Sequence, residues 1–326
     1  MTRPAASARA ALQGSGLAEL PALVAVAAIL AWLAVAHPAL LPTWAPWDFS
    51  WTEFLASVLG AWWYARGVAR APAASRPSLW RQAAFAIGLG LIYVVLLTHF
   101  EYMAQHMFFL NRVQSLVLLH LGPFLVALAW PGAELLRWMP EPARRFARSA
   151  ALRRLGRGLQ QPALAAVLFV GLIYLWLIPP VHFRAMLDPT LYDLMNWSMV
   201  VAGLLFWCLV LDPRPPAEAR ASFAVRMIAT VLVMFPQILL GAFLTFSDTT
   251  LYSYYDLCGR LFPSMGALTD QHIGGIILWI PGAMMSSIAF LLVLNRVRIF
   301  EDRLPALELP DEKDRTIVVA ASWTGR

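Results

Sequence analysis

The sequence predicts an all-α protein: a polytopic transmembrane helical bundle of about eight spans, or seven if the first is cleaved, with both termini cytoplasmic. Three observations lead to this fold class. Of the 326 residues, 60% are hydrophobic and only 13% are charged, which is too apolar for an ordinary soluble domain. The apolar residues gather in runs of about 20, the length of a membrane-crossing helix. Arginines fill the connections between these runs, and the 14 tryptophans suit the membrane interfaces.

The chain divides into a short tail, a long series of apolar segments and a second tail. Residues 1–16 are rich in Ala, Ser and Arg and are expected to form a flexible tail. The segments expected to cross the membrane are 17–36, 51–64, 82–107, 113–130, 162–178, 191–211, 223–246 and 272–294. They make one transmembrane domain, 17–294, followed by a cytoplasmic tail, 295–326. The first segment has a rival interpretation as a cleaved signal peptide, but its apolar run is longer than a usual signal core, which favours a retained helix.

Polar residues and prolines are expected to interrupt several helices. A short polar bend near 110–111 should join the third and fourth spans. Pro123 should bend the fourth span, Pro236 the seventh and Pro281 the eighth, because proline lacks the N–H that a helix interior uses. Gln237, beside one of these prolines, is expected to satisfy backbone groups that the proline frees.

The arginines orient the predicted bundle. All but three of the 25 basic residues fall in the two tails or in connections on the same side of the membrane. The exceptions are Arg112, Arg184 and Arg260. Basic residues stay on the cytoplasmic side, which places both termini there, and the arginine run 137–157 is interpreted as an anchor near anionic lipid. No basic patch with interleaved aromatic residues occurs, so we expect a lipid bilayer and no nucleic acid as partner.

This orientation places all six histidines in the outer half of the membrane or in extracytoplasmic loops. In a helix, His99, Met103 and His106 share one face at i, i+4 and i+7. On antiparallel helices, His99 and His120 would lie at similar depth. Imidazole and thioether groups are donors for borderline or soft metal ions. The plainer alternatives are histidines that bond a neighbouring helix and methionines that fill gaps in the core.

Three further polar residues have two interpretations each. Asp248 belongs to a turn after the seventh span or to a site. Asp270 is a good N-cap for the eighth helix or a group that orients an imidazole. His182 follows a Pro-Pro exit from the fifth span and is an ordinary loop histidine or a ligand.

The sequence lacks the common signatures of catalysis. Cys208 and Cys258 belong to no paired motif and are expected on opposite sides of the membrane, so neither a disulfide nor a thiolate metal site is predicted. No phosphate-binding glycine loop, dinucleotide fingerprint or HExxH motif occurs. We therefore do not expect an enzyme.

Four segments between residues 97 and 294 form a series: Met103-Ala-Gln-His106-Met107 with Gly122-Pro123; Ile178-Pro-Pro-Val-His182, Leu191-Tyr192 and Gly203-Leu-Leu-Phe-Trp207; Gly241-Ala-Phe-Leu-Thr-Phe-Ser-Asp248 with Leu251-Tyr252; and Asp270-Gln271, Gly275, Trp279 and Pro281-Gly282. The series resembles the bacterial CtaG family of cytochrome c oxidase assembly factors. The resemblance implies a helical bundle of the cell inner membrane that helps to mature the oxidase, with copper delivery as the usual proposal. One difference is that the family commonly has a histidine directly before the methionine of the first segment, where this chain has Tyr102.

The resulting hypothesis is an extracytoplasmic-facing assembly factor that handles copper, with oxidase subunits or copper chaperones as partners. The residues assigned to the site are His99, Met103, His106 and His120 as core ligands, His182 and His272 as outer ligands, and Tyr102, Asp248 and Asp270 as supporting groups. One alternative is a haem- or quinone-binding redox protein with His99 and His120 as axial ligands. Another is a cofactor-free scaffold for oxidase subunits. A copper permease is disfavoured because no polar ladder crosses the inner half.

Overall fold

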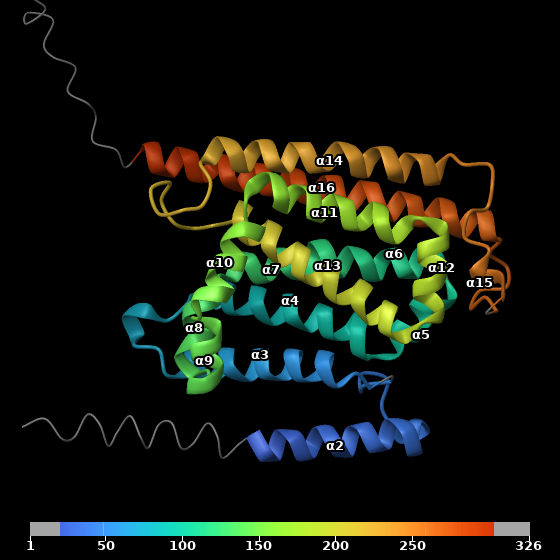
Figure 1. Cartoon of the computed structure of the whole chain (residues 1–326), viewed down its shortest axis with the longest axis horizontal. Coiled ribbons are helices and arrows are strands. Elements are labelled where there is room, and N and C mark those ends of the chain that lie inside the picture. The colour runs from blue at the N-terminus through green and yellow to red at the C-terminus, as the bar shows by residue number, and fades with distance from the viewer. Residues whose placement is uncertain (1–19, 48, 258, 303–326) are drawn as a thin grey trace, which may run out of the picture.

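The computed structural model describes residues 20–47, 49–257 and 259–302, and every regular element within these ranges is helical. The long helices lie roughly parallel or antiparallel to one axis (Figure 1). They are α2 (Leu20–Ala36), α3 (Trp51–Ala69), α4 (Leu79–Leu97), α6 (Phe108–Leu116) continued by η3 (Val117–Leu121) and α7 (Gly122–Ala129), α11 (Pro162–Leu177), α13 (Pro189–Val210), α14 (Phe223–Thr245) and α16 (Ala267–Glu301). The all-helical class is as predicted.

Short helices close the two ends of this bundle. At one end lie α5 (His99–His106), α12 (Pro179–Leu187) and α15 (Tyr254–Leu257), and we call it the α12 end. At the other, the α10 end, lie α8 (Gly132–Trp138), α9 (Glu141–Ala147) and α10 (Ala150–Leu159). Single 3-10 turns occur at η1 (Pro38–Leu40) and η2 (Ala73–Ser75).

Several helices have the length and composition of membrane spans. Within the described ranges, five qualify singly: α4, the continuous α6–α7 stretch, α13, α14 and α16. A sixth is counted if α10 and α11, which are bent by 74° at their junction, are taken together. The helix α2 is apolar but shorter. The chain is therefore a membrane protein with several apolar helices. The predicted tail 1–16 and all of the C-terminal tail beyond residue 302 lie outside the described residues, while α16 runs past its predicted end at residue 294 to Glu301.

The break between the third and fourth predicted spans is not where the sequence placed it. The chain is helical through 110–111 and is interrupted instead at Thr98 and Met107, which flank the short helix α5. Thr98 caps α5 because its hydroxyl accepts a hydrogen bond from Phe100 N. Met107 is extended, with φ −142° and ψ 131°. Asn111, the polar residue at the predicted bend, lies inside α6 and is buried. It belongs to a buried polar contact and not to a turn.

Pro123 was expected to bend its helix, and the structure shows an altered turn before it in a stretch that continues to Ala129. The turn before it, η3, is a π-helix, and Pro123 has no N–H to donate to the carbonyl of Leu119, four residues earlier. The indole Nε1 of Trp207 on α13 donates to that carbonyl at 3.0 Å instead. Gly203, one turn earlier on α13, permits this approach: a β-carbon there would lie 2.8 Å from Pro123 Cγ and against the Leu119 carbonyl.

The other two prolines do not end their helices. Helix α14 continues through Pro236, and α16 continues through Pro281. The Gln237 amide donates to the carbonyl of Val233 at 2.8 Å, next to the carbonyl that Pro236 leaves without its helical donor. The Pro236 carbonyl accepts a hydrogen bond from Tyr174 at 2.8 Å. The Gln237 side chain thus bonds the carbonyl next to the freed one and not the freed Leu232 carbonyl itself, which differs from the expectation.

Candidate functional site

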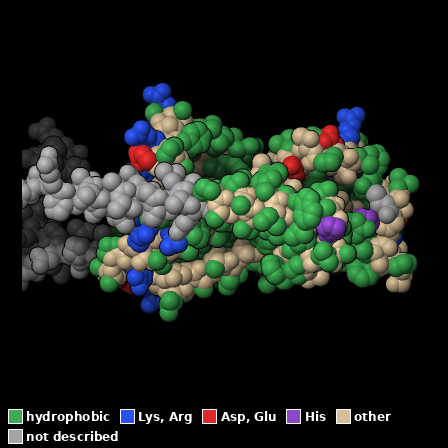
Figure 2. Space-filling view, turned by 90° about the horizontal axis from the view of Figure 1, so that it is seen from below, with side chains coloured by type: hydrophobic (Ala, Val, Ile, Leu, Met, Phe, Trp, Pro, Cys, Tyr) green, Lys and Arg blue, Asp and Glu red, His purple; other side chains and the backbone are tan. Residues whose placement is uncertain are grey.

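The residues of the predicted site that lie together are on α5. The indole of Trp47 meets the His99 ring edge-on, with centroids 4.4 Å apart. Tyr102 contacts both imidazoles of the helix, with ring centroids 5.3 Å from His99 and 4.2 Å from His106. Met103 and both imidazoles are partly exposed, and Figure 2 shows histidine side chains on the surface toward the α12 end. The predicted shared face of α5 is therefore formed.

His106 is oriented by its own helix. Its Nδ1 donates to the backbone carbonyl of Tyr102 at 2.8 Å. A hydrogen bond of this kind selects the tautomer in which Nε2 carries the free lone pair. Metal-binding histidines commonly have a backbone carbonyl as the partner of the second nitrogen. The His106 ring is thus arranged so that a ligand can reach its Nε2.

His120 is held in the bundle interior, away from α5. It lies on η3, is only 2% exposed, and its Nε2 is 2.8 Å from the side-chain oxygen of Gln237. Because the Gln237 amide group already donates to Val233, its oxygen is the acceptor and His120 Nε2 is the donor. His120 Nδ1 is then an acceptor, and no described group donates to it.

A small cavity lies beside this free nitrogen. Arg112 and His120 both line it, and the space open to the centre of a water-sized sphere is about 10 Å³, enough for about one water molecule. Arg112 is 2% exposed, and its Nε also lacks a partner among the described residues. The sequence analysis assigned Arg112 only to the outer side and did not identify it as a buried group.

Both ring nitrogens of His182 form hydrogen bonds with neighbouring groups. It lies on α12, is 1% exposed, and its Nδ1 donates to the carbonyl of Trp176 at 3.0 Å. Its Nε2 accepts from the hydroxyl of Tyr255, 2.9 Å away. The pKa of His182 is lowered to about 3, first by burial and then by the nearby Arg112 guanidinium, while the hydrogen bond to Trp176 acts in the opposite direction. His182 therefore lies in a helix and not in the expected loop, and it has the contacts of a buried structural histidine.

The residues predicted around His272 are also separate. His272 Nε2 donates to the carbonyl of Ser247 at 2.9 Å. Asp248 is exposed and makes no hydrogen bond with a described histidine. The contacts therefore do not give Asp248 the expected role of orienting an imidazole.

Asp270 caps a helix, but not its own. The N-cap of α16 is Gly266, one turn earlier. The fully buried Asp270 carboxylate instead accepts hydrogen bonds from the backbone of Phe108 and Phe109, at 3.0 and 2.8 Å, and so caps the N-terminus of α6. It also forms a 2.8 Å ion pair with Arg260. The predicted supporting role for an imidazole is replaced by a link between α6 and α16.

The six predicted ligands do not converge. Within the described ranges, no group of three or more His, Cys, Asp or Glu side chains is arranged to hold a metal ion. His99, Met103 and His106 share α5, whereas His120, His182 and His272 each bond other groups. The ring contacts of His99 and His120 have no residue in common. Cys208 is a free thiol, and Cys258 lies outside the described residues.

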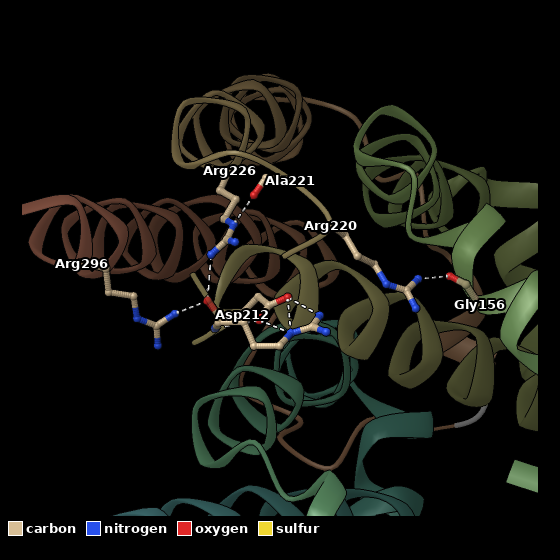
Figure 3. A network of polar contacts seen from close by, with 7 residues as sticks. Gly156, Asp212, Arg220, Ala221, Arg226 and Arg296 are labelled. Atoms are coloured by element: carbon tan, nitrogen blue, oxygen red, sulfur yellow. Dashed lines mark hydrogen bonds and ion pairs between the residues drawn. The ribbon is translucent and has the colours of Figure 1, made fainter. Parts of the chain in front are cut away.

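A second polar network occupies the α10 end (Figure 3). Asp212 follows α13, is 2% exposed, and its carboxylate binds Arg214 through two nitrogens, the shortest contact being 2.6 Å. Its backbone carbonyl accepts from Arg226 at 2.8 Å and from Arg296 at 3.1 Å. This network ties α13, α14 and α16 together, and the sequence analysis identified its arginines only as cytoplasmic charges.

Comparison with protein families gives one match. The model of the family described as cytochrome c oxidase caa3 assembly factor (Caa3_CtaG) matches residues 62–298, well over half of the chain. No curated protein and no solved structure matches significantly. The matched region begins in α3 and includes α5 and the buried polar groups described above.

Proposed function

Because the chain belongs to the CtaG family of cytochrome c oxidase caa3 assembly factors, we propose that it is a multi-pass protein of the bacterial inner membrane that assists oxidase assembly and handles copper on α5. In this proposal the long helices make eight spans with both termini cytoplasmic. The α10 end faces the cytoplasm, since it carries the arginine run 137–157. The α12 end, with α5, faces the extracytoplasmic side, where oxidase subunits or copper chaperones meet it.

The observation that carries the copper proposal is the arrangement of His106. Its Nδ1 is engaged by the Tyr102 carbonyl, and its Nε2 is left for a ligand. His99 and Met103 lie on the same partly exposed face. Two imidazoles and a thioether form a donor set that suits copper, and Cu(I) in particular accepts thioether sulfur. Copper is the cargo here, so a site on a short surface helix with few ligands favours release.

The remaining predicted ligands take a different part in this proposal. His120, His182 and His272 maintain the bundle through bonds to Gln237, to Trp176 and Tyr255, and to Ser247. Their replacement would alter stability before it altered copper binding.

The test is the copper content of the purified full-length chain. His99→Ala and His106→Ala are compared with His37→Ala, which replaces an exposed histidine at the N-cap of η1 that packs on Trp32. We expect copper stoichiometry to fall in the first two variants and to stay unchanged in the third. Equal stoichiometry in all of them would eliminate the α5 site. The copper occupancy of the oxidase, measured in a deletion strain carrying each variant, then shows whether the site serves assembly.

A scaffold without cofactor is the second candidate, and the hydrogen bonds of the buried imidazoles favour it, because those rings have structural partners already. Under this alternative, replacing both His99 and His106 leaves oxidase assembly intact, whereas copper handling predicts an oxidase deficient in copper. Haem binding is tested in the same preparation, where a Soret band in the optical spectrum would favour it.

A further inference from the structure

Helix α10 lies across the bundle and not along it. It is joined to α11 at Gln160 and Gln161, and the two helices are bent by 74°. Because α11 runs with the other long helices (Figure 1), α10 lies close to the plane of a membrane that α11 crosses. Its 10 residues extend over about 15 Å. The two glutamines mark the level at which the apolar sequence of α11 begins.

The side chains of α10 divide into two kinds, and most of them are exposed. No residue of α10 is buried. Leu152 and Leu155, three residues apart and so on one face, are 38% and 57% exposed. Arg153, Arg154 and Arg157 are also exposed. A short helix with an unpacked apolar face beside several arginines has the composition of a helix that lies in a membrane interface.

The surroundings of α10 carry an excess of positive charge. Arg220 donates to the Gly156 carbonyl at 2.8 Å and fastens the helix to the loop before α14 (Figure 3). Burial lowers the pKa of Arg220, and the neighbouring Arg214 and Arg157 lower it further. The carboxylate of Asp212 opposes this effect but is already engaged by Arg214. The protein itself therefore leaves these arginines only partly neutralised.

The exposed apolar surface continues from α10 onto the membrane span. Leu164 and Val167, on the first two turns of α11, are 37% and 64% exposed. A lipid monolayer is apolar beside α11 and anionic beside the arginines, so it matches both parts of this surface.

We propose that α10 is an in-plane surface helix that binds anionic phospholipid, with Leu152 and Leu155 at the acyl boundary and Arg153, Arg154 and Arg157 on the headgroup phosphates. The proposal depends on the membrane orientation of α11 and not on copper handling.

The test places a spin label at Leu155→Cys or Arg154→Cys in the full-length chain, with Cys208 and Cys258 changed to alanine. The labelled proteins are reconstituted in nanodiscs of phosphatidylcholine, with or without phosphatidylglycerol. We expect the label at position 155 to be accessible to oxygen and protected from a water-soluble nickel reagent, and the label at 154 to show the reverse. Adding phosphatidylglycerol should increase the difference. Equal access of the nickel reagent to both positions in both lipids would overturn the proposal.

A matched pair of variants separates α10 from general surface charge. With the label at position 155, Arg153→Gln/Arg154→Gln should abolish the effect of phosphatidylglycerol on the protection of that label from the nickel reagent. Arg144→Gln/Arg145→Gln on α9 should preserve it, because both of those arginines pair with Glu141. An equal loss in the two double variants, or protection of position 155 in detergent by a copurifying protein, would exclude a specific lipid-binding role for α10.

Discussion

The hydrogen bond from Trp207 to the Leu119 carbonyl is open to a quantitative test. Trp207→Phe keeps an aromatic ring at a position that is 0% exposed but removes the indole N–H that donates to that carbonyl. The Leu119 carbonyl lacks its usual helical donor because Pro123 has no N–H. The loss of stability in Trp207→Phe should therefore depend on whether residue 123 is proline. A loss caused by packing alone would not depend on it.

The expected cost has two parts. A buried carbonyl left without a donor costs about 1–3 kcal/mol. The smaller phenyl ring leaves a cavity of some tens of Å³, which at about 24 cal/mol per Å³ adds about 1 kcal/mol. Trp207→Phe alone should therefore destabilise the fold by about 2–4 kcal/mol. In a Pro123→Ala background the residue at 123 regains an N–H that can donate to Leu119, so only the cavity part should remain.

The assay is equilibrium unfolding in mixed detergent micelles, followed by circular dichroism so that loss of an indole does not affect the signal. The four proteins of the cycle give the coupling between positions 123 and 207. Trp176→Phe is the control, because its indole donates to the Ser198 hydroxyl at 3.0 Å and not to the carbonyl behind Pro123. If Trp207→Phe costs the same with and without Pro123, the carbonyl is satisfied in another way and the explanation of η3 is wrong.

Three further outcomes are expected. Gly274→Ala should destabilise by about 1–3 kcal/mol in thermal unfolding, since its β-carbon would lie 2.5 Å from a ring atom of Phe108, whereas Gly156→Ala, with nothing within 4 Å, should stabilise by up to about 1 kcal/mol. His182 has a pKa lowered to about 3 in the folded chain, so its contribution to stability is complete above the unfolded value of about 6.5 and falls by up to about 1.4 kcal/mol per pH unit below it. A His182→Gln variant should show a flatter stability profile between about pH 6.5 and 5, and an unchanged slope would contradict the assignment. Asp270→Ala should speed hydrogen exchange of the first α6 amides, and unaltered exchange would show that α6 has another cap.

Helix positions were largely accessible from the sequence, because a bilayer demands long apolar segments. The predicted segments 162–178, 191–211 and 223–246 agree with α11, α13 and α14 to within two residues. The sequence predictions failed where a polar residue could indicate either an exposed turn or a buried polar contact. The stretch near 110–111 was taken as a polar bend, yet Asn111 is fully buried and accepts a hydrogen bond from the Arg112 side chain. A buried polar contact and an exposed bend look alike until the neighbouring helices are placed.

The site was harder to predict because spacing fixes only which residues share a helix face. That was enough for His99, Met103 and His106, which lie on the same helix. It could not reveal that Gln237, 117 residues further along the chain, bonds His120, or that Asp270 caps a helix that begins 162 residues earlier. Depth in the membrane was the only information that linked the remaining histidines, and side chains at equal depth can face different neighbours.

The segments that carry the family resemblance gain a structural meaning from these contacts. Gly203 and Trp207 lie one turn apart on α13. Gly203 leaves room for the backbone of η3 to approach. Trp207 donates to the Leu119 carbonyl, which Pro123 leaves without its helical donor. Gly203 and Trp207 together accommodate a proline that removes a backbone hydrogen bond inside a membrane helix. Resemblance at these positions therefore supports a common fold, whereas a common copper chemistry depends on the exposed face of α5, where Tyr102 stands in place of the family's usual histidine. Introducing Tyr102→His should raise copper affinity if that face is the site, and it should leave copper binding unchanged if the family resemblance reflects only the bundle.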